Sequence, residues 1–253
     1  MTMASMAARR GYAWLKVGWR LFRRDTTLWV AMAAFYLIMV AVLDQIPFIG
    51  YLLLVFVTPL MLAGALITAA EVEQTEPDHK KIDDWRAWLK LLTRRALISL
   101  LRVFVDPAKT LSVMVLATLL LGAVVVVQIL AQLLKVGGPA LPAMLQGSVG
   151  PSIWVPALIS LFLVWLLKLL LAFGTLYAVQ LVAIGEETPL GALEKSARAL
   201  MNHAGAITVL ALLLPVPLML IASFSDIAVL LVSLLSLPML VTSVYSSAQE
   251  VYS

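Results

Sequence analysis

The charged residues of this chain are gathered into three short segments, and this distribution constrains the fold more than any other feature. Of its 18 basic and 14 acidic residues, 27 lie in residues 9–25, 71–109 and 186–198. The rest of the 253-residue chain holds only Asp44, Lys135, Lys168, Asp226 and Glu250. Long uncharged apolar stretches between charged segments are typical of a chain that crosses a membrane several times.

The composition excludes a water-soluble domain and several kinds of site. Hydrophobic residues make up 62% of the chain and charged residues 13%, against about 45–50% and about 25% in soluble proteins. The absence of cysteine excludes disulfides and thiolate metal sites. The net charge of +4 comes with no nucleic-acid recognition motif. Because the basic residues flank apolar stretches, we expect anionic lipid headgroups, and not nucleic acid, as their partners.

Six apolar stretches are long enough to cross a bilayer, whose hydrocarbon core of about 30 Å requires about 20 helical residues. We therefore predict an all-α, polytopic membrane protein with a single integral domain over residues 1–253. The predicted spans are residues 27–43, 50–70, 110–134, 160–184, 206–222 and 227–247. The N-terminus keeps charged and aromatic residues through Asp25, so we do not expect a cleavable signal peptide.

The distribution of Lys and Arg predicts the orientation. With six spans, the N-terminal segment, residues 71–109 and residues 185–205 share one side, and they carry 16 of the 18 basic residues. The opposite side carries Lys135 alone. Cytoplasmic loops are enriched in Lys and Arg, so we expect both termini in the cytoplasm.

Residues 9–24 predict a basic amphipathic helix that lies flat in the headgroup layer. Tyr12, Trp14 and Trp19 add aromatic rings typical of a membrane interface. The residues expected to contact lipid headgroups are Arg9, Arg10, Lys16, Arg20, Arg23 and Arg24.

Two further amphipathic interfacial helices are predicted in the other charged segments. In residues 81–105, apolar residues recur every three or four positions, the period of a helix. In residues 188–203, Thr188 is a suitable N-cap and Pro189 a suitable first helical residue. The apolar stripe predicted for this helix is Leu190, Leu193, Ala197 and Leu200.

An interfacial helix followed by two spans thus occurs three times. Repeated units with broken helices would favour a transporter. Any series of hairpins with positively charged inner loops, however, gives the same pattern, and both interpretations stay open.

The stretches GYAWLKVGWRLFRRDTTLWV, TPLMLAGALITAAE and LYAVQLVAIGEETPLGALEKSARALMNHAGA resemble a family of uncharacterised six-helix proteobacterial inner-membrane proteins. More distantly, the chain is similar to YciC-type proteins and to the membrane domain of glycerophosphodiester phosphodiesterases. The resemblance implies a bacterial inner (plasma) membrane location but no activity. Many relatives carry an aromatic-Pro pair where this chain has Tyr177-Ala178, so the proline kink is not expected here.

Lys168 is the one charged residue deep inside an apolar stretch, where ionisable residues are candidate functional residues. It either snorkels to the outer interface, pairs with Asp226 or Asp44, or contacts a substrate. Pro215 and Pro217 are predicted to break the fifth span, leaving either a static kink or an unwound segment beside a cavity.

Small and polar residues in the spans predict helix packing. Gly64-x-x-x-Thr68 and the serines of the sixth span favour close helix approach over a polar pathway. Gln180 is expected to hydrogen-bond between helices. The serines are Ser233, Ser236, Ser243 and Ser247.

The sequence contains no clear catalytic, metal-ligating or cofactor-binding set, and we expect no cofactor. His79 and His203 lack a further metal ligand at a suitable spacing. We expect a non-enzymatic component of a membrane complex, or an envelope-organising protein, with a membrane-protein partner or a second copy of itself. The alternatives are a small permease or lipid-handling transporter and, third, an intramembrane hydrolase that uses His203 or Lys168 with a serine.

Overall fold

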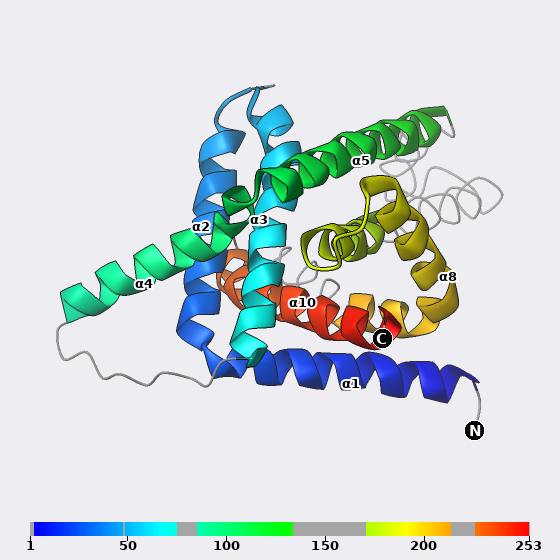
Figure 1. The fold of residues 1–253 in the computed structure, drawn as a ribbon, viewed down its shortest axis with the longest axis horizontal. Coiled ribbons are helices and arrows are strands. Elements are labelled where there is room, and N and C mark those ends of the chain that lie inside the picture. Colours follow the sequence, from blue (N-terminus) through cyan, green and yellow to red (C-terminus); the bar gives the residue numbers. More distant parts are fainter. Residues whose placement is uncertain (1–2, 48, 75–84, 134–170, 214–225, 253) are drawn as a thin grey trace, which may run out of the picture.

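All regular secondary structure in the described part of the protein is helical (Figure 1). The computed structural model describes residues 3–47, 49–74, 85–133, 171–213 and 226–252. Its elements are α1 (Met3–Arg24), α2 (Thr26–Asp44), α3 (Ile49–Gln74), α4 (Trp85–Leu100), the 3₁₀ turn η1 (Arg102–Val105), α5 (Pro107–Leu133), the helical segment Leu171–Ala183, α8 (Pro189–Leu213) and α10 (Asp226–Tyr252). The predicted all-α class is confirmed for these residues.

The first two predicted spans correspond closely to α2 and α3. The turn between them falls at Gln45–Pro47, where the sequence places it. Asp25 begins α2 because its carboxylate accepts a hydrogen bond from the Leu28 amide at 3.2 Å. The same carboxylate pairs with Arg95 of α4 at 3.0 Å, which fixes α4 beside the start of α2.

Three helices in the described residues are long and apolar enough to cross a membrane: Thr26–Asp44, Ile49–Gln74 and Leu230–Tyr252. Shorter apolar helical stretches occur at Pro107–Ala123 and Leu171–Ala183. These fall in the predicted third and fourth spans. Parts of the third, fourth and fifth predicted spans lie outside the described residues.

The predicted interfacial helix at residues 81–105 needs correction within the described residues. The α-helix ends at Leu100, a 3₁₀ turn follows, and Ala96, Leu100 and Val103 are buried in the protein. Gly64 of α3 explains this burial: a Cβ at Gly64 would lie 2.3 Å from the Leu100 carbonyl oxygen. The missing side chain lets the end of α4 reach the α3 backbone, as the small-residue pattern of α3 predicted.

The third predicted interfacial helix and the start of the fifth predicted span are the two parts of α8, which meet at a kink at His203. Thr188 caps α8 as predicted, with its hydroxyl accepting from the Gly191 amide at 3.2 Å. At His203 the backbone leaves helical geometry, with φ −118° and ψ 18°, and two helices meet there at a kink. Of the predicted apolar stripe, Leu190 and Ala197 are exposed on the protein surface, and Leu193 and Leu200 are partly buried. Before the kink at His203, the buried residues of α8 are small, Ala192, Ser196 and Ala199, which permit close packing.

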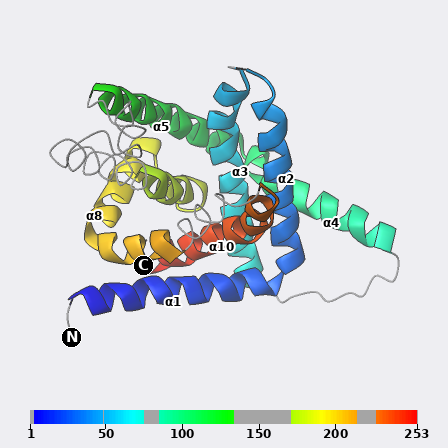
Figure 2. The same cartoon turned by 180° about the vertical axis from the view of Figure 1, so that it is seen from behind.

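Helix α1 packs along α10 and α8, as Figures 1 and 2 show from opposite sides. Its contacts run antiparallel to α10: Arg10 and Trp14 approach Glu250, and Gly18 lies against the Ser243 backbone. Trp14 is 2% exposed, so its predicted interfacial position is wrong. It faces the protein because the neighbouring helix surface offers both an apolar pocket and a carboxylate partner.

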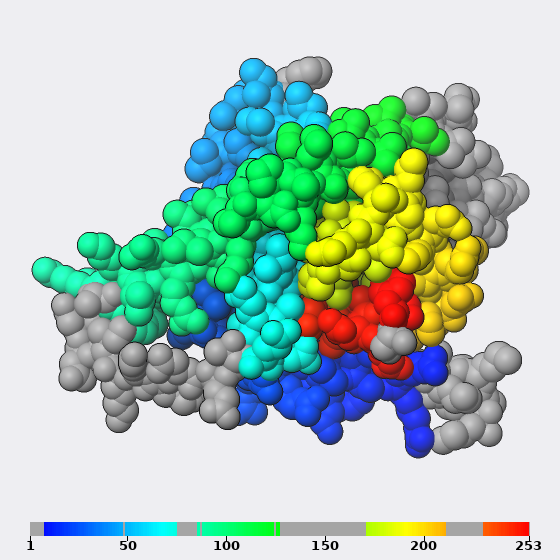
Figure 3. Space-filling view, in the orientation of Figure 1, coloured from blue at the N-terminus to red at the C-terminus, as the bar shows by residue number. Residues whose placement is uncertain are grey.

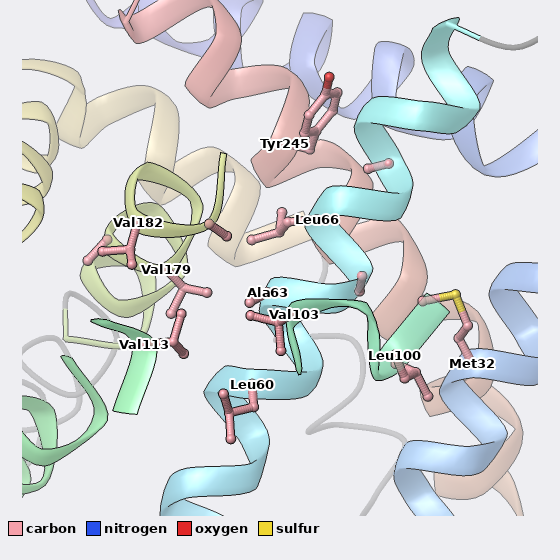
Figure 4. Close-up of a cluster of buried hydrophobic side chains, with 14 of the residues drawn as sticks. Met32, Leu60, Ala63, Leu66, Leu100, Val103, Val113, Val179, Val182 and Tyr245 are labelled. Atoms are coloured by element: carbon pink, nitrogen blue, oxygen red, sulfur yellow. The ribbon is translucent and has the colours of Figure 1, made fainter. Parts of the chain in front are cut away.

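The main hydrophobic core forms around α3. Figure 4 shows Leu60, Ala63 and Leu66 of α3 pointing toward Val113 of α5 and Val179 of the segment Leu171–Ala183. All five side chains are buried. The core therefore joins the first hairpin to the elements of the second.

The three predicted interfacial helices pack in a cyclic order. Helix α4 packs on the α2–α3 hairpin, and α8 packs on α5. Helix α1 closes the order by packing on α8 and α10. Each predicted interfacial helix thus contacts the pair of spans before it in the chain, and α1 contacts the last pair. Three such units would form a closed ring.

Candidate functional site

The densest group of polar contacts in the described residues joins α1, α3, the segment Leu171–Ala183 and the last turns of α10. We call this group the polar junction. It comprises Arg10, Trp14, Arg24, Glu73, Tyr177, Gln180, Tyr245, Ser246, Ser247, Gln249 and Glu250.

Glu250 and Trp14 hold α1 on α10. The Trp14 indole N–H donates to Glu250 Oε2 at 2.6 Å, and Arg10 Nε lies 3.7 Å from Glu250 Oε1. The Ser246 hydroxyl donates to the Trp14 carbonyl at 3.1 Å. An indole N–H needs an acceptor when the ring is buried, and the carboxylate supplies one, so this contact fixes the position of the ring.

Tyr245 and Arg24 tie the end of α3 to the same place. The Tyr245 hydroxyl donates to Glu73 Oε2 at 2.7 Å and accepts from Gln249 Nε2 at 3.2 Å. The Arg24 guanidinium donates to the Val72 and Glu73 carbonyls at 3.2 and 2.7 Å. A cation on the last carbonyls of a helix satisfies free acceptors and complements the helix dipole.

The segment Leu171–Ala183 joins the junction through two hydrogen bonds. The Tyr177 and Ser247 hydroxyls lie 2.7 Å apart, and Gln180 Nε2 donates to the Tyr245 carbonyl at 3.3 Å. The interhelical hydrogen bond predicted for Gln180 is therefore confirmed. Tyr177 is fully buried and stacks edge-on with Tyr252, with ring centroids 6.3 Å apart.

Glutamates near the ends of the three hairpin units make ion pairs with the next interfacial helix or the turn after it. Glu71, at the end of α3, pairs with Arg102 in the turn after α4. Glu187 pairs with Lys195 of α8, and Glu250 faces Arg10 of α1. These pairs follow the same order along the chain as the helix packing.

The residues predicted to contact lipid headgroups divide into two groups on α1. Arg9, Lys16, Arg20 and Arg23 are exposed on the face opposite the buried Trp14 and Gly18. Arg10 and Arg24 are exposed as well, but they also contact Glu250 and the α3 carbonyls as described above. The basic face of α1 therefore remains accessible while its other face is packed on the protein.

The remaining sequence-predicted candidates are not all placed. Lys168, Pro215, Pro217 and His79 lie outside the described residues. His203 sits at the kink of α8, where its ring packs edge-on against Trp14 at 6.3 Å between centroids.

Within the described ranges, no group of three or more His, Cys, Asp or Glu side chains is placed to hold a metal ion. The carboxylates Glu73 and Glu250 each accept a hydrogen bond from an aromatic side chain, and these bonds join different helices. The observed chemistry of the polar junction is therefore the joining of helices.

Sequence reasoning missed most of the polar junction. Glu250 was a usable signal, because it is an isolated charge close to the end of a long apolar stretch. Nothing local identified its donor as Trp14, which lies 236 residues away in sequence. Tyr245 and Glu73 likewise lie 172 residues apart.

No protein-family model, no curated protein and no solved structure matches this chain. The resemblance to six-helix inner-membrane proteins stays a prediction.

Proposed function

We propose that this chain is a six-span protein of a bacterial inner membrane, with both termini in the cytoplasm, that organises a membrane complex and is not an enzyme. The observation that carries this proposal is the surface of α4. This helix extends from the bundle at one edge of the molecule (Figures 1 and 3). Its exposed side chains include Trp85 at 65%, Trp88 at 40% and Leu91 at 45% exposure, with Lys90 and Arg94 among them.

An exposed aromatic surface with interspersed cations favours a partner-binding role. Trp and Arg are enriched at the energetic centres of protein interfaces. Large exposed apolar surfaces mark contacts with proteins or membranes. The polar junction supports the same role, because its carboxylates and tyrosines bond helices together and give α1 and α10 fixed positions.

The proposed orientation is supported by the contact between the chain ends. Arg10 of α1 faces Glu250 in the last turns of α10, so the two termini share one side of the protein. The basic face of α1 lies on that side as well. Cationic residues next to apolar helices face the cytoplasm.

Single-cysteine labelling tests the orientation, and the native chain has no cysteine to interfere. We expect a membrane-impermeant maleimide to label Gln45→Cys in intact cells, because Gln45 is exposed in the turn between α2 and α3. Arg20→Cys on α1 and Gln249→Cys on α10 should react only after the membrane is permeabilised. The reverse pattern would show that the termini face outward.

Co-purification tests the organising role. We compare the wild type with a Trp85→Gln/Leu91→Gln double variant of α4, and the control is Leu190→Gln/Met201→Gln on α8. The control residues are also exposed, at 69% and 74%. We expect quantitative mass spectrometry after mild-detergent extraction to recover the same membrane proteins with wild type and control. Recovery with the α4 variant should fall at least about ten-fold, because one interfacial Trp often contributes about 2 kcal/mol or more.

Two results would contradict the organising role. The first is recovery of the chain alone, in monomeric form. The second is equal loss of partners in the α4 and α8 variants, which would indicate general misfolding. Recovery of a second copy only would identify the complex as a homo-oligomer.

The alternative proposal, a small permease or lipid-handling transporter, is favoured by one observation. An apolar cavity lies between α2, α3 and α10. Transport would require this cavity to communicate with Lys168, and accessibility of a Lys168→Cys side chain to water-soluble reagents tests that connection.

A further inference from the structure

Helix α1 contacts one end of each of the three described helices that are apolar enough to cross a membrane. Near its start, Arg10 lies 3.7 Å from Glu250 in the last turns of α10. At its end, Arg24 donates to the carbonyls at the end of α3, and the next residue, Asp25, caps the start of α2. Because the charged ends of three candidate spans meet this one helix, α1 lies along one boundary of the apolar layer.

The basic face of α1 is exposed along the helix. It carries Arg9, Lys16, Arg20 and Arg23, whose spacings of seven, four and three residues place them on one side of an α-helix. From Arg9 to Arg23 this stripe is about 21 Å long at the rise of an α-helix. Figure 3 shows α1 along the lower edge of the molecule. The stripe is therefore accessible to a large ligand or to a surface.

No carboxylate neutralises the stripe. Helix α1 contains no Asp or Glu, and none of its four cations makes an ion pair in the part of the chain that the structure describes. Helix α8 differs, because its exposed Lys195 and Arg198 pair with Glu187 and Glu194. The positive field of the α1 stripe is uncompensated, so its complement is an anionic surface.

The aromatic residues of α1 indicate how such a surface is bound. Tyr12 and Trp19 are 63% and 42% exposed, and Trp and Tyr are enriched where lipid headgroups lie. Trp14, Leu21 and Phe22, in contrast, are buried against the protein. A helix that inserts into a bilayer uses its apolar face. In α1 that face is already covered by protein, so binding falls to the cations and the exposed aromatic rings.

We propose that the basic face of α1 binds the headgroups of anionic phospholipids electrostatically, without inserting the apolar face of the helix. Groups of about four to eight Lys and Arg next to a transmembrane helix bind anionic lipids, and the ends of the three candidate spans place the stripe at headgroup depth. Of the six basic residues expected to contact headgroups, the structure assigns four to this role, because Arg10 and Arg24 are held by Glu250 and by the α3 carbonyls. The proposal goes beyond the organising role, since it requires no protein partner.

The test uses the purified full-length chain, delipidated in detergent. It is titrated with anionic palmitoyl-oleoyl phosphatidylglycerol or with zwitterionic phosphatidylcholine of the same acyl chains, and native mass spectrometry gives the ratio of the two affinities. We expect wild type to prefer phosphatidylglycerol. In Lys16→Gln/Arg20→Gln this preference should fall about five-fold for each cation removed. Lys16→Arg/Arg20→Lys keeps both charges and should bind like wild type.

The matched control is Lys195→Gln/Arg198→Gln on α8, which changes the net charge by the same amount. These two side chains are 51% and 67% exposed but already paired with carboxylates, so the preference of wild type should persist. Both double variants alter exposed residues and should unfold at the temperature of wild type. Salt at about 1 M shortens the screening length to about 3 Å and should abolish the preference of wild type.

Several outcomes would overturn the proposal. Equal affinity of wild type for the two lipids would show that α1 does not select headgroups, and a preference that persists in about 1 M salt would show that apolar contact dominates. Equal losses in the α1 and α8 variants would show that net charge, and not the stripe, selects the lipid. Tighter binding of a poly-glutamate peptide than of phosphatidylglycerol would assign this face to an acidic protein. Displacement of the lipid by inorganic phosphate would assign it to the phosphate group alone.

Discussion

Replacing Trp14 by Ala is expected to give the largest loss of stability of any substitution in α1, about 3–5 kcal/mol. The ring is 2% exposed, its N–H bonds Glu250 at 2.6 Å, and it packs edge-on against His203. Its removal leaves a cavity and removes the donor from the Glu250 carboxylate. We expect thermal unfolding in detergent at a clearly lower temperature, and faster trypsin cleavage at the basic residues of α1.

Two variants serve as controls for Trp14. Trp19→Ala removes the same kind of ring from the same helix, but Trp19 is 42% exposed, so we expect a loss of about 1 kcal/mol or less. Trp14→Phe keeps an aromatic ring and removes the N–H, so we expect an intermediate loss of about 1–3 kcal/mol. Equal destabilisation by Trp14→Ala and Trp19→Ala would show that α1 does not pack on α10 in this way.

The second large effect is expected at Gly64. In Gly64→Ala, the new Cβ would lie 2.3 Å from the Leu100 carbonyl oxygen and 2.7 Å from that of Ser99. Both neighbours are backbone atoms, so the end of α4 must move as a unit. We expect a loss of about 1–3 kcal/mol, typical of overpacking in a close-packed interior. The measurement is thermal unfolding in detergent.

Gly122→Ala is the matched control, because Gly122 also lies inside a helix but a Cβ added there would meet no atom within 4 Å. Ala is a better helix former than Gly by about 1 kcal/mol. We therefore expect Gly122→Ala to be neutral or stabilising, opposite in sign to Gly64→Ala. Destabilisation by both variants, to the same extent, would contradict a specific contact between α3 and α4.

The local features of the fold could be predicted from the sequence. The ends of α2 and α3 fall within a few residues of the predicted spans, because charged residues and Pro47 limit an apolar stretch that is otherwise uninterrupted. The start of α8 is also predicted, since Thr188 and Pro189 act within one helical turn. Such features depend on neighbours in sequence.

The candidate site could be predicted only in part. The exposed basic face of α1 follows from its amphipathic pattern, and the close approach at Gly64 follows from the small-residue pattern of α3. The pattern did not show that Trp14 is buried, because the same Trp suits a membrane interface equally well. The pattern also did not show that Ala192 and Ala199 of α8 are buried in the protein while Leu190 is exposed.

The sequence by itself determined the class of this protein. Sixty-two per cent hydrophobic residues, with the charges gathered into three segments, suit long helices in an apolar solvent, because an unpaired charge is costly there. The tertiary structure alone decided which face of each helix is buried and which groups form the polar junction. Lipid can surround any face of an apolar helix, so the apolar pattern does not determine which face is buried. That face is selected by close contact between helix backbones and by hydrogen bonds between residues distant in sequence, such as Trp14 and Glu250.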